Sequence, residues 1–413
     1  MSNEIQTPES VGMSSQRLAR IGVAMQGYVD AGTVRGISTL VMRRGKVVHA
    51  EQFGHRDAEA GLSMTPDTIF RIYSMTKPIV STALMLLHEE SAFQLDDPVA
   101  KYLPAFGATE VLSADGSLVP QSRPMQVRDL LTHTSGLTYD FMEDTPVGEL
   151  YRQARIMNDA TRTLEETIDA LALIPLASQP GSRWHYSVGI DVAARLVEVL
   201  SGQSLGDFLA ERLFKPLGMI DTGFGVPASE LDRLAAMYGL PDLIGPDHTG
   251  TKLVAAAMVG FNERIDVTAT YPTATPEVFA RGGLGLFSTI GDYARFSQML
   301  LNGGHLDGTR IVGRKTLELM HANHLPAELL PYQLLGQDSY GLGFGLGSRV
   351  MMDVAASAGS GSVGEYGWAG AAKTYYWVDP AEDLVGIFMA QYMTGVESPD
   401  RAMRSLTYQA IDD

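Results

Sequence analysis

Strand-forming sequence lies at the two ends of this chain, and helix-forming sequence fills the middle. Residues 36–54 favour two strands around a turn at Arg44-Gly45, because β-branched residues flank that turn. Short aromatic or β-branched runs return near the other end, at 340–346, 366–369, 374–378 and 384–392. This distribution favours a single sheet domain assembled from both ends of the chain, with a helical insertion between them.

Helical periodicity supports the same organisation. Apolar spacing predicts helices over residues 14–31, from at or just before Ser74, over 191–200 with Gly202 as a C-terminal cap, and over about 400–411. Residues 94–280 contain several such stretches, joined by loops rich in proline and glycine. We therefore expect residues 1–93 and 281–413 to form the α/β sheet domain, and residues 94–280 a mainly helical insertion domain.

Composition excludes several functional classes. With 413 residues, 45% of them hydrophobic, the chain can bury a sizeable core. A formal net charge of −17 argues against nucleic acid and anionic membranes as partners. No apolar run reaches the length of about 18 residues that a membrane span needs. The absence of cysteine excludes disulfides and thiolate chemistry. The polar first ten residues do not resemble a signal peptide, so we expect a cytoplasmic protein.

Ser74-Met75-Thr76-Lys77 is the first candidate for chemistry. Ser74 is the only serine followed three residues later by lysine, and on a helix this spacing places both side chains on one face. Serine becomes a nucleophile when a neighbouring base accepts its proton, and a helix N-terminus offers N–H groups to an oxyanion. The spacing alone fits equally well an ordinary N-cap serine and a surface lysine. The apolar helix face that follows favours a partly desolvated lysine.

Two further segments can complete such a site. A Pro180-Gly181 turn leads into an aromatic run that ends with Tyr186, whose phenol can pass a proton between Ser74 and a leaving group; the alternative is a core tyrosine with a satisfied hydroxyl. Residues 364–374 hold Trp368-Ala369-Gly370-Ala371 before a strand. Small residues on a strand let a substrate carbonyl approach the backbone, and such a strand can donate an oxyanion N–H; the alternative is simply a strand that contains glycine.

Taken in this order, Ser74-x-x-Lys77, Tyr186 and Trp368-x-Gly370 resemble the serine β-lactamase-like superfamily, which includes class C β-lactamases, DD-peptidases and family VIII carboxylesterases. Further segments are similar to that superfamily over roughly residues 10–395: 95–99, 102–104, 130–137 and 281–289. The resemblance implies a β-lactamase/DD-peptidase-like fold, with an antiparallel sheet, flanking helices and an inserted helical domain. It also implies an active site at the seam between the two domains.

Two departures separate this chain from the lactamases. Val188 stands where those enzymes have an asparagine, and Trp368-Ala369-Gly370 replaces their Lys-Thr/Ser-Gly on the substrate strand. Losing the strand lysine removes a cation suited to a substrate carboxylate, whereas tryptophan offers apolar surface to a neutral ester. Both departures resemble the family VIII carboxylesterases. The chain contains no Gly-x-Ser-x-Gly sequence, which argues against an α/β-hydrolase.

We therefore expect a serine hydrolase that cleaves short-chain carboxylic esters, a small-molecule substrate, without a cofactor. Ser74 is the expected nucleophile, Lys77 and Tyr186 transfer protons, and the backbone N–H groups of Ser74 and Ala371 hold the oxyanion. The alternatives are a β-lactamase or DD-peptidase-like amidase, an acyltransferase that uses the same acyl-enzyme and, more remotely, a non-catalytic binding member of the fold.

The remaining expectations concern the surroundings of the site. Trp368 and Gly370 are expected to contact substrate. Tyr139 and Phe141 are expected to line the acyl pocket, although core packing is the commoner role of such residues. His133 is expected to order a turn. His321 and His324 lack the carboxylate or HExxH context of a metal site, so no metal is expected.

Overall fold

The computed structural model describes residues 4–142, 144–239, 263–393 and 397–413. Residues 240–262 of the expected helical insertion lie outside this description. The largest sheet has eight strands in the order β14-β15-β16-β17-β18-β1-β2-β3, and every neighbouring pair is antiparallel. Its strands are β1 (Gly36–Arg43), β2 (Lys46–Asp57), β3 (Leu62–Ser63), β14 (Leu342–Phe344), β15 (Arg349–Met351), β16 (Tyr366–Gly370), β17 (Thr374–Asp379) and β18 (Leu384–Ala390).

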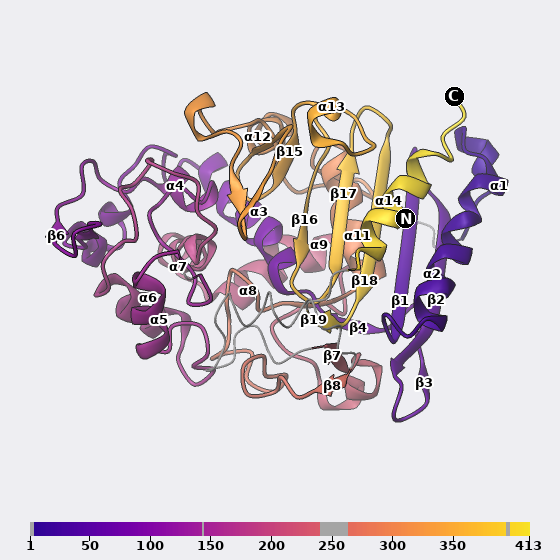
Figure 1. Ribbon diagram of the computed structural model, residues 1–413, viewed down its shortest axis with the longest axis horizontal. Helices are drawn as coiled ribbons and strands as arrows, with labels where there is room; N and C mark the ends of the chain where they lie inside the picture. The colour runs from indigo at the N-terminus through magenta and orange to yellow at the C-terminus, as the bar shows by residue number, and fades with distance from the viewer. Residues whose placement is uncertain (1–3, 143, 240–262, 394–396) are drawn as a thin grey trace.

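The two ends of the chain meet in the middle of this sheet. β1 pairs with β18 along its length, from Ile37 opposite Ala390 to Arg43 opposite Leu384. The strands of residues 36–54 and those near the C-terminus therefore form one sheet, as the sequence predicts. Figure 1 shows the indigo N-terminal strands beside the yellow C-terminal ones, with the magenta helical region on the other side.

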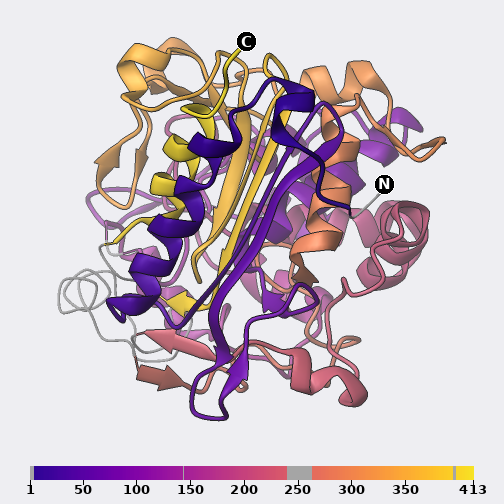
Figure 2. The same ribbon diagram turned by 90° about the vertical axis from the view of Figure 1, so that its right-hand side faces the viewer.

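Helices cover both faces of the sheet, so the central strands are apolar on both sides. Along β18, Val385, Ile387 and Met389 belong to the larger core, whereas Phe388 and Ala390 belong to a second core on the opposite face. Figure 2 shows that second face covered by α2 and α14. This two-sided burial explains why β18 is hydrophobic at nearly every position rather than at alternate ones.

The α-helices lie in three groups. The N- and C-terminal helices that cover the second core are α1 (Ser15–Leu18), α2 (Arg20–Asp30) and α14 (Pro399–Tyr408). Those of the middle region are α4 (Val127–Leu131), α5 (Val147–Gln153), α6 (Leu164–Ala172), α7 (Gly189–Ser201), α8 (Leu205–Leu209) and α9 (Lys215–Leu217). The others are α3 (Thr76–Glu89), α11 (Ile290–Leu301), α12 (Arg314–Met320) and α13 (Val354–Ser357).

Small sheets complete the fold. They are formed by β4 (Ile69–Arg71) with β9 (Phe287–Thr289), by β5 (Val111–Leu112) with β6 (Leu118–Val119), by β7 (Met237–Gly239) with β8 (Glu263–Ile265) and β19 (Tyr392–Met393), by β10 (His305–Leu306) with β11 (Thr309–Arg310), and by β12 (Gln333–Leu334) with β13 (Gln337–Asp338).

The expected strand over 384–392 is interrupted, and the reason is a long-range contact. The Gln391 side chain accepts a hydrogen bond from Arg71 N and donates one to Arg71 O, both at 3.0 Å. The chain therefore leaves the large sheet after β18, and Tyr392 and Met393 pair with β7 instead. The expected strand over 340–346 is also shorter, and β15 follows it without having been predicted.

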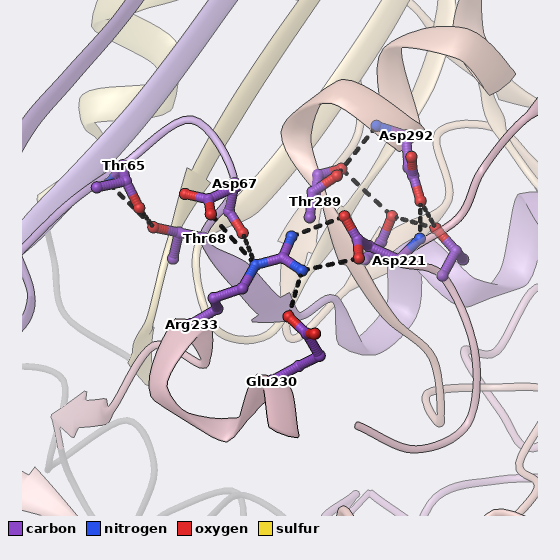
Figure 3. A network of polar contacts seen from close by, with 10 residues as sticks. Thr65, Asp67, Thr68, Asp221, Glu230, Arg233, Thr289 and Asp292 are labelled. Carbon is purple, nitrogen blue, oxygen red and sulfur yellow. Dashed lines mark hydrogen bonds and ion pairs between the residues drawn. The ribbon is translucent and has the colours of Figure 1, made fainter. Parts of the chain in front are cut away.

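A polar network centred on Arg233 holds the loop around residues 221–233 against β4 and β9 (Figure 3). The Arg233 guanidinium donates to both oxygens of Asp221, at 2.9 and 2.7 Å, and to Glu230 and the Asp67 carbonyl. Asp292, in the first turn of α11, accepts from Asp221 N at 2.8 Å. Because β4 leads directly to Ser74, this network fixes the segment that presents the serine.

Candidate active site

Ser74 lies in a tight turn between β4 and α3. The backbone of Tyr73 takes a positive φ of 44°, a conformation that a bulky residue rarely adopts, and Tyr73–Met75 form one turn of 3-10 helix. The α-helix itself begins at Thr76, two residues later than expected. The bond from Ile72 N to Leu286 O, at 3.1 Å, anchors this turn to the segment before β9.

Lys77 occupies the first turn of α3 and is buried, with 1% of its surface exposed. Its Nζ donates to Ser74 Oγ at 3.0 Å and to the carbonyl oxygen of Gly283 at 2.7 Å. The rings of Tyr139 and Tyr186 lie with their centroids 5.3 and 4.7 Å from the ammonium. Lys77 is thus held in one position, beside the serine oxygen.

Tyr186 reaches the serine from the loop before α7. Its hydroxyl donates to Ser74 Oγ at 2.7 Å. The bond from Gly181 N to Thr134 O, at 2.7 Å, fixes the Pro180-Gly181 turn, and that from His185 N to His133 O, at 2.8 Å, fixes the backbone beside Tyr186. Ser74 Oγ is therefore within proton-transfer distance of both an amine and a phenol.

The end of β16 lies against the serine turn. Trp368 Nε1 donates to the Tyr186 hydroxyl at 3.4 Å. A Cβ added to Gly370 would stand 2.3 Å from the carbonyl oxygen of Ile72, so only glycine allows this approach. Thr374 Oγ1 donates to the same carbonyl at 3.2 Å. Ala371 follows Gly370 directly, at the end of β16 that packs against the Ser74 turn; its role as an oxyanion donor stays a prediction.

We expect Gly370→Ala to lower kcat/KM for an ester by about 100-fold, the size of effect that a displacement of about 1 Å can have on a reacting group. The added methyl would push β16 away from Ile72 and so move the serine turn. Steady-state kinetics would measure the change. Gly27→Ala is the matched control, because a Cβ at Gly27 of α2 meets nothing within 4 Å. Equal activity of both variants would mean that the close approach is unimportant.

Tyr186 belongs to a cluster of rings, called here the ring cluster: His133, Tyr139, Trp184, Tyr186, Phe344 and Trp368. Tyr139 contacts Tyr186, with ring centroids 5.1 Å apart. Phe141 stacks on Tyr139 with ring centroids 4.9 Å apart, so the rings of Tyr139 and Tyr186 connect it to Ser74. Both are buried, and their contact with substrate stays a prediction.

Sequence reasoning did not assign Trp184 and Phe344 to the site. Trp184 lies two residues before Tyr186, in the same aromatic run. This closeness in sequence to Tyr186 is the observation that could have assigned Trp184 to the site. Phe344 comes from β14, more than 150 residues further along the chain, and contacts the Trp368 ring at 5.2 Å. Nothing local to its sequence marks it, because only the sheet topology places β14 near Trp368.

The two histidines near the site are structural in character. His133 adopts φ 57° in its turn, and burial together with the nearby Lys77 holds its pKa well below the usual value, so it is neutral. Arg183 donates to His185 Nδ1 at 2.8 Å, which leaves the ring proton on Nε2, 2.7 Å from Thr138 Oγ1. Burial lowers the pKa of His185 to about 4. His185 therefore bonds away from Ser74.

One sizeable cavity among the described residues lies away from Ser74. It measures about 610 Å³ and is lined by residues of β7, of β8 and of the loops around them, together with Arg71. We place the candidate site at Ser74, because the hydrogen-bonded serine, amine and phenol are there. Within the described part of the chain, no group of three or more His, Asp or Glu side chains could hold a metal ion. No helix in that part is long and apolar enough to cross a bilayer.

Comparison with known proteins identifies relatives over nearly the whole chain. The family model described as Beta-lactamase matches residues 24–409. An uncharacterized protein of Mycobacterium tuberculosis is 35% identical over 378 residues, which cover 88% of this chain and 87% of that protein. Esterase EstB of Burkholderia gladioli is 30% identical over 375 residues, which cover 89% and 88% of the two chains.

Solved structures agree with this relationship. EstCE1, described as a hydrolase with promiscuous acyltransferase activity, superimposes with a TM-score of 0.77 at 27% identity, covering 95% of this chain and 99% of its own. A family VIII carboxylesterase superimposes with a TM-score of 0.71 at 20% identity, covering 98% and 100% of the two chains. The second likeness concerns the fold alone and confirms the expected architecture.

Proposed function

The chain belongs to the beta-lactamase family of serine hydrolases, and we propose that within this family it hydrolyses short-chain carboxylic esters through an acyl-serine intermediate. One observation carries the proposal: Ser74 Oγ stands 3.0 Å from Lys77 Nζ and 2.7 Å from the Tyr186 hydroxyl. A serine between an amine and a phenol can lose its proton as it attacks a carbonyl.

The reaction has two halves. In acylation, Ser74 Oγ bonds to the ester carbonyl carbon while its proton passes to the Lys77–Tyr186 pair. The carbonyl oxygen becomes an oxyanion, held by the N–H groups of Ser74 and Ala371. The bond to the alcohol oxygen then breaks, and the alcohol leaves with the proton held by the pair. In deacylation, water gives one proton to the same pair as its oxygen bonds to the acyl carbon. The bond from that carbon to Ser74 Oγ then breaks, the pair returns the proton to Oγ, and the acid leaves.

The wall beside the serine favours an uncharged substrate. Trp368 places an indole ring 5.6 Å from the Tyr186 ring, at the strand position where a lactamase carries a cation. Val188, buried at the start of α7, replaces the polar asparagine of lactamases. A β-lactam or peptide carboxylate would lose its usual charged partner, whereas a neutral ester needs none. The similarity to an esterase of Burkholderia gladioli supports the same choice.

We expect kcat/KM for p-nitrophenyl butyrate to exceed that for nitrocefin by about 100-fold, because a charge-assisted hydrogen bond to a carboxylate is worth up to about 3 kcal/mol. Both substrates are followed by absorbance with one enzyme preparation, and Ser74→Ala supplies the background rate. An added alcohol acceptor, with product analysis, shows whether transfer competes with hydrolysis. If nitrocefin is the better substrate, the enzyme is a lactamase and the ester proposal is wrong.

A further inference from the structure

Behind Lys77 a chain of buried hydrogen bonds leads away from the active site. The Gly283 carbonyl accepts from Lys77 Nζ at 2.7 Å, and the N–H of the same residue donates to Asp191 Oδ1 at 3.0 Å. A Cβ at Gly283 would lie 2.5 Å from Asp191 Oδ2, so the carboxylate is packed tightly against this backbone. Asp191 is only 3% exposed. Asp191 thus helps to hold Gly283 in the position from which its carbonyl accepts the hydrogen bond of Lys77.

Beyond Asp191 the chain of contacts stops at three unpaired atoms. Among the described residues, Asp191 Oδ2 and Arg281 Nε and Nη1 are buried without any hydrogen-bond partner. Arg281 is 2% exposed, and its remaining nitrogen, Nη2, donates to the carbonyls of Asp159 and Arg162 at 3.1 and 2.9 Å. Leaving a charged acceptor and two charged donors unpaired in a core costs several kcal/mol in principle, and native proteins avoid it.

Asp191 and Arg281 also line one small cavity, whose volume is about 10 Å³. Its other walls are Ile156, Met157, Val188 and three side chains of α6. That volume is close to the minimum of about 10–15 Å³ for one buried water, which typically needs two to four polar partners. The hydroxyl of Thr167, the other polar side chain in the wall, already donates to Thr163 O at 2.8 Å.

We propose that one structural water binds in this cavity, accepting hydrogen bonds from Arg281 and donating one to Asp191 Oδ2, and that the resulting chain from Arg281 to Gly283 positions Lys77 for proton transfer. Asp191 and Arg281 are positioning residues, since neither touches Ser74. The charges agree with this arrangement: burial raises the pKa of Asp191, while Lys77, the backbone N–H of Gly283 and Arg281 oppose that rise. The proposal rests on the proposed roles of Ser74 and Lys77.

A crystal structure of the wild-type protein tests the water directly. The expected result is density for one water within hydrogen-bond distance of Asp191 Oδ2 and the Arg281 guanidinium. An empty cavity, or a direct ion pair between the two side chains, would overturn the proposal. This readout does not depend on which substrate the enzyme uses.

Kinetics test the positioning role. Arg281→Met, Asp191→Asn and the double variant should each lower kcat by about tenfold or more, with KM within about twofold, because the lysine is displaced but the acyl pocket is not. The rate of reaction with a fluorophosphonate should fall equally. Both rates are divided by the number of serines that the fluorophosphonate titrates at completion, so a partly unfolded sample does not imitate the effect. Arg281→Lys should recover part of the rate, since its ammonium can still donate to the water.

Ile168→Val is the control, because it removes one methyl from the same cavity wall and its side chain forms no hydrogen bond in the series from Arg281 to Lys77. It should lower the melting temperature and leave the rate per titrated serine unchanged. If Arg281→Met behaves in the same way, or if the effects of the single changes multiply in the double variant, the positioning role is wrong. A wild type that reacts with the fluorophosphonate but cleaves no ester would instead overturn the proposed function.

Discussion

Ser74→Ala is expected to lower kcat for an ester by about 10⁶-fold, the loss typical when the nucleophile of a serine hydrolase is removed. The melting temperature should change by no more than about 2 °C, since a hydrogen bond contributes about 1 kcal/mol. Lys77 keeps its bond to Gly283 O, and Tyr186 keeps its contact with Trp368. Turnover of p-nitrophenyl butyrate and fluorophosphonate labelling measure the loss of activity, and calorimetry measures the melting temperature.

Ser81→Ala is the matched control for this variant. Ser81 lies on α3, the helix that follows the Ser74 turn; it is fully buried, and its hydroxyl has no hydrogen-bond partner among the described residues. Its removal should leave activity near that of the wild type. Retained turnover in Ser74→Ala would mean that another residue is the nucleophile, and the proposed mechanism would be wrong.

The second large effect concerns Lys77 and Tyr186. Lys77→Ala, Tyr186→Phe and the double variant should each lower kcat by about 10³-fold, with no further loss in the double variant. Both side chains bond to the same Ser74 oxygen, so removing either one already interrupts the proton transfer that they share. Pre-steady-state acylation and steady-state kinetics of the three variants measure this non-additivity.

Tyr151→Phe serves as the control for the loss of a tyrosine hydroxyl. Tyr151 of α5 is fully buried and lies outside the ring cluster. Its variant should retain nearly full activity. If the two single effects instead multiply in the double variant, Lys77 and Tyr186 act independently, and Tyr186 is a packing residue.

The sequence predicts those parts of the site that are encoded locally. Ser74 and Lys77 are three residues apart, and this spacing brings them together because the 3-10 turn at Ser74 continues directly into α3. Tyr186 required the order of several motifs, because a lone tyrosine after a Pro-Gly turn has many possible roles. The assembly of the sheet from both chain ends followed from the distribution of strand patterns, whereas its antiparallel arrangement followed from the family resemblance. The division at residues 93/94 and 280/281 stays a prediction.

Features that depend on distant partners were not predictable in this way. The break after β18 arises because Gln391 bonds to the backbone of Arg71, more than 300 residues earlier. The 3-10 turn at Ser74 arises from the positive φ of Tyr73, which no propensity predicts for a tyrosine. In the sequence, Asp191 is a single polar residue at the start of the apolar helix predicted over residues 191–200. Its link to Lys77 passes through the backbone N–H and carbonyl of Gly283, and a contact through backbone atoms leaves no pattern in the sequence.

The place of β16 and β18 beside Ser74 has a consequence for the synthesis of the protein. The serine turn lies against Gly370 and Thr374, and Arg71 is bonded to Gln391, so the last fifty residues of the chain form part of its support. β1 likewise has no partner on one edge until β18 emerges from the ribosome. Ser74, Lys77 and Tyr186 are all translated before β16, β17 and β18, but they cannot be fixed in place until those strands have been made. Such non-local pairing slows folding, so the nascent chain carries these three residues long before their surroundings exist.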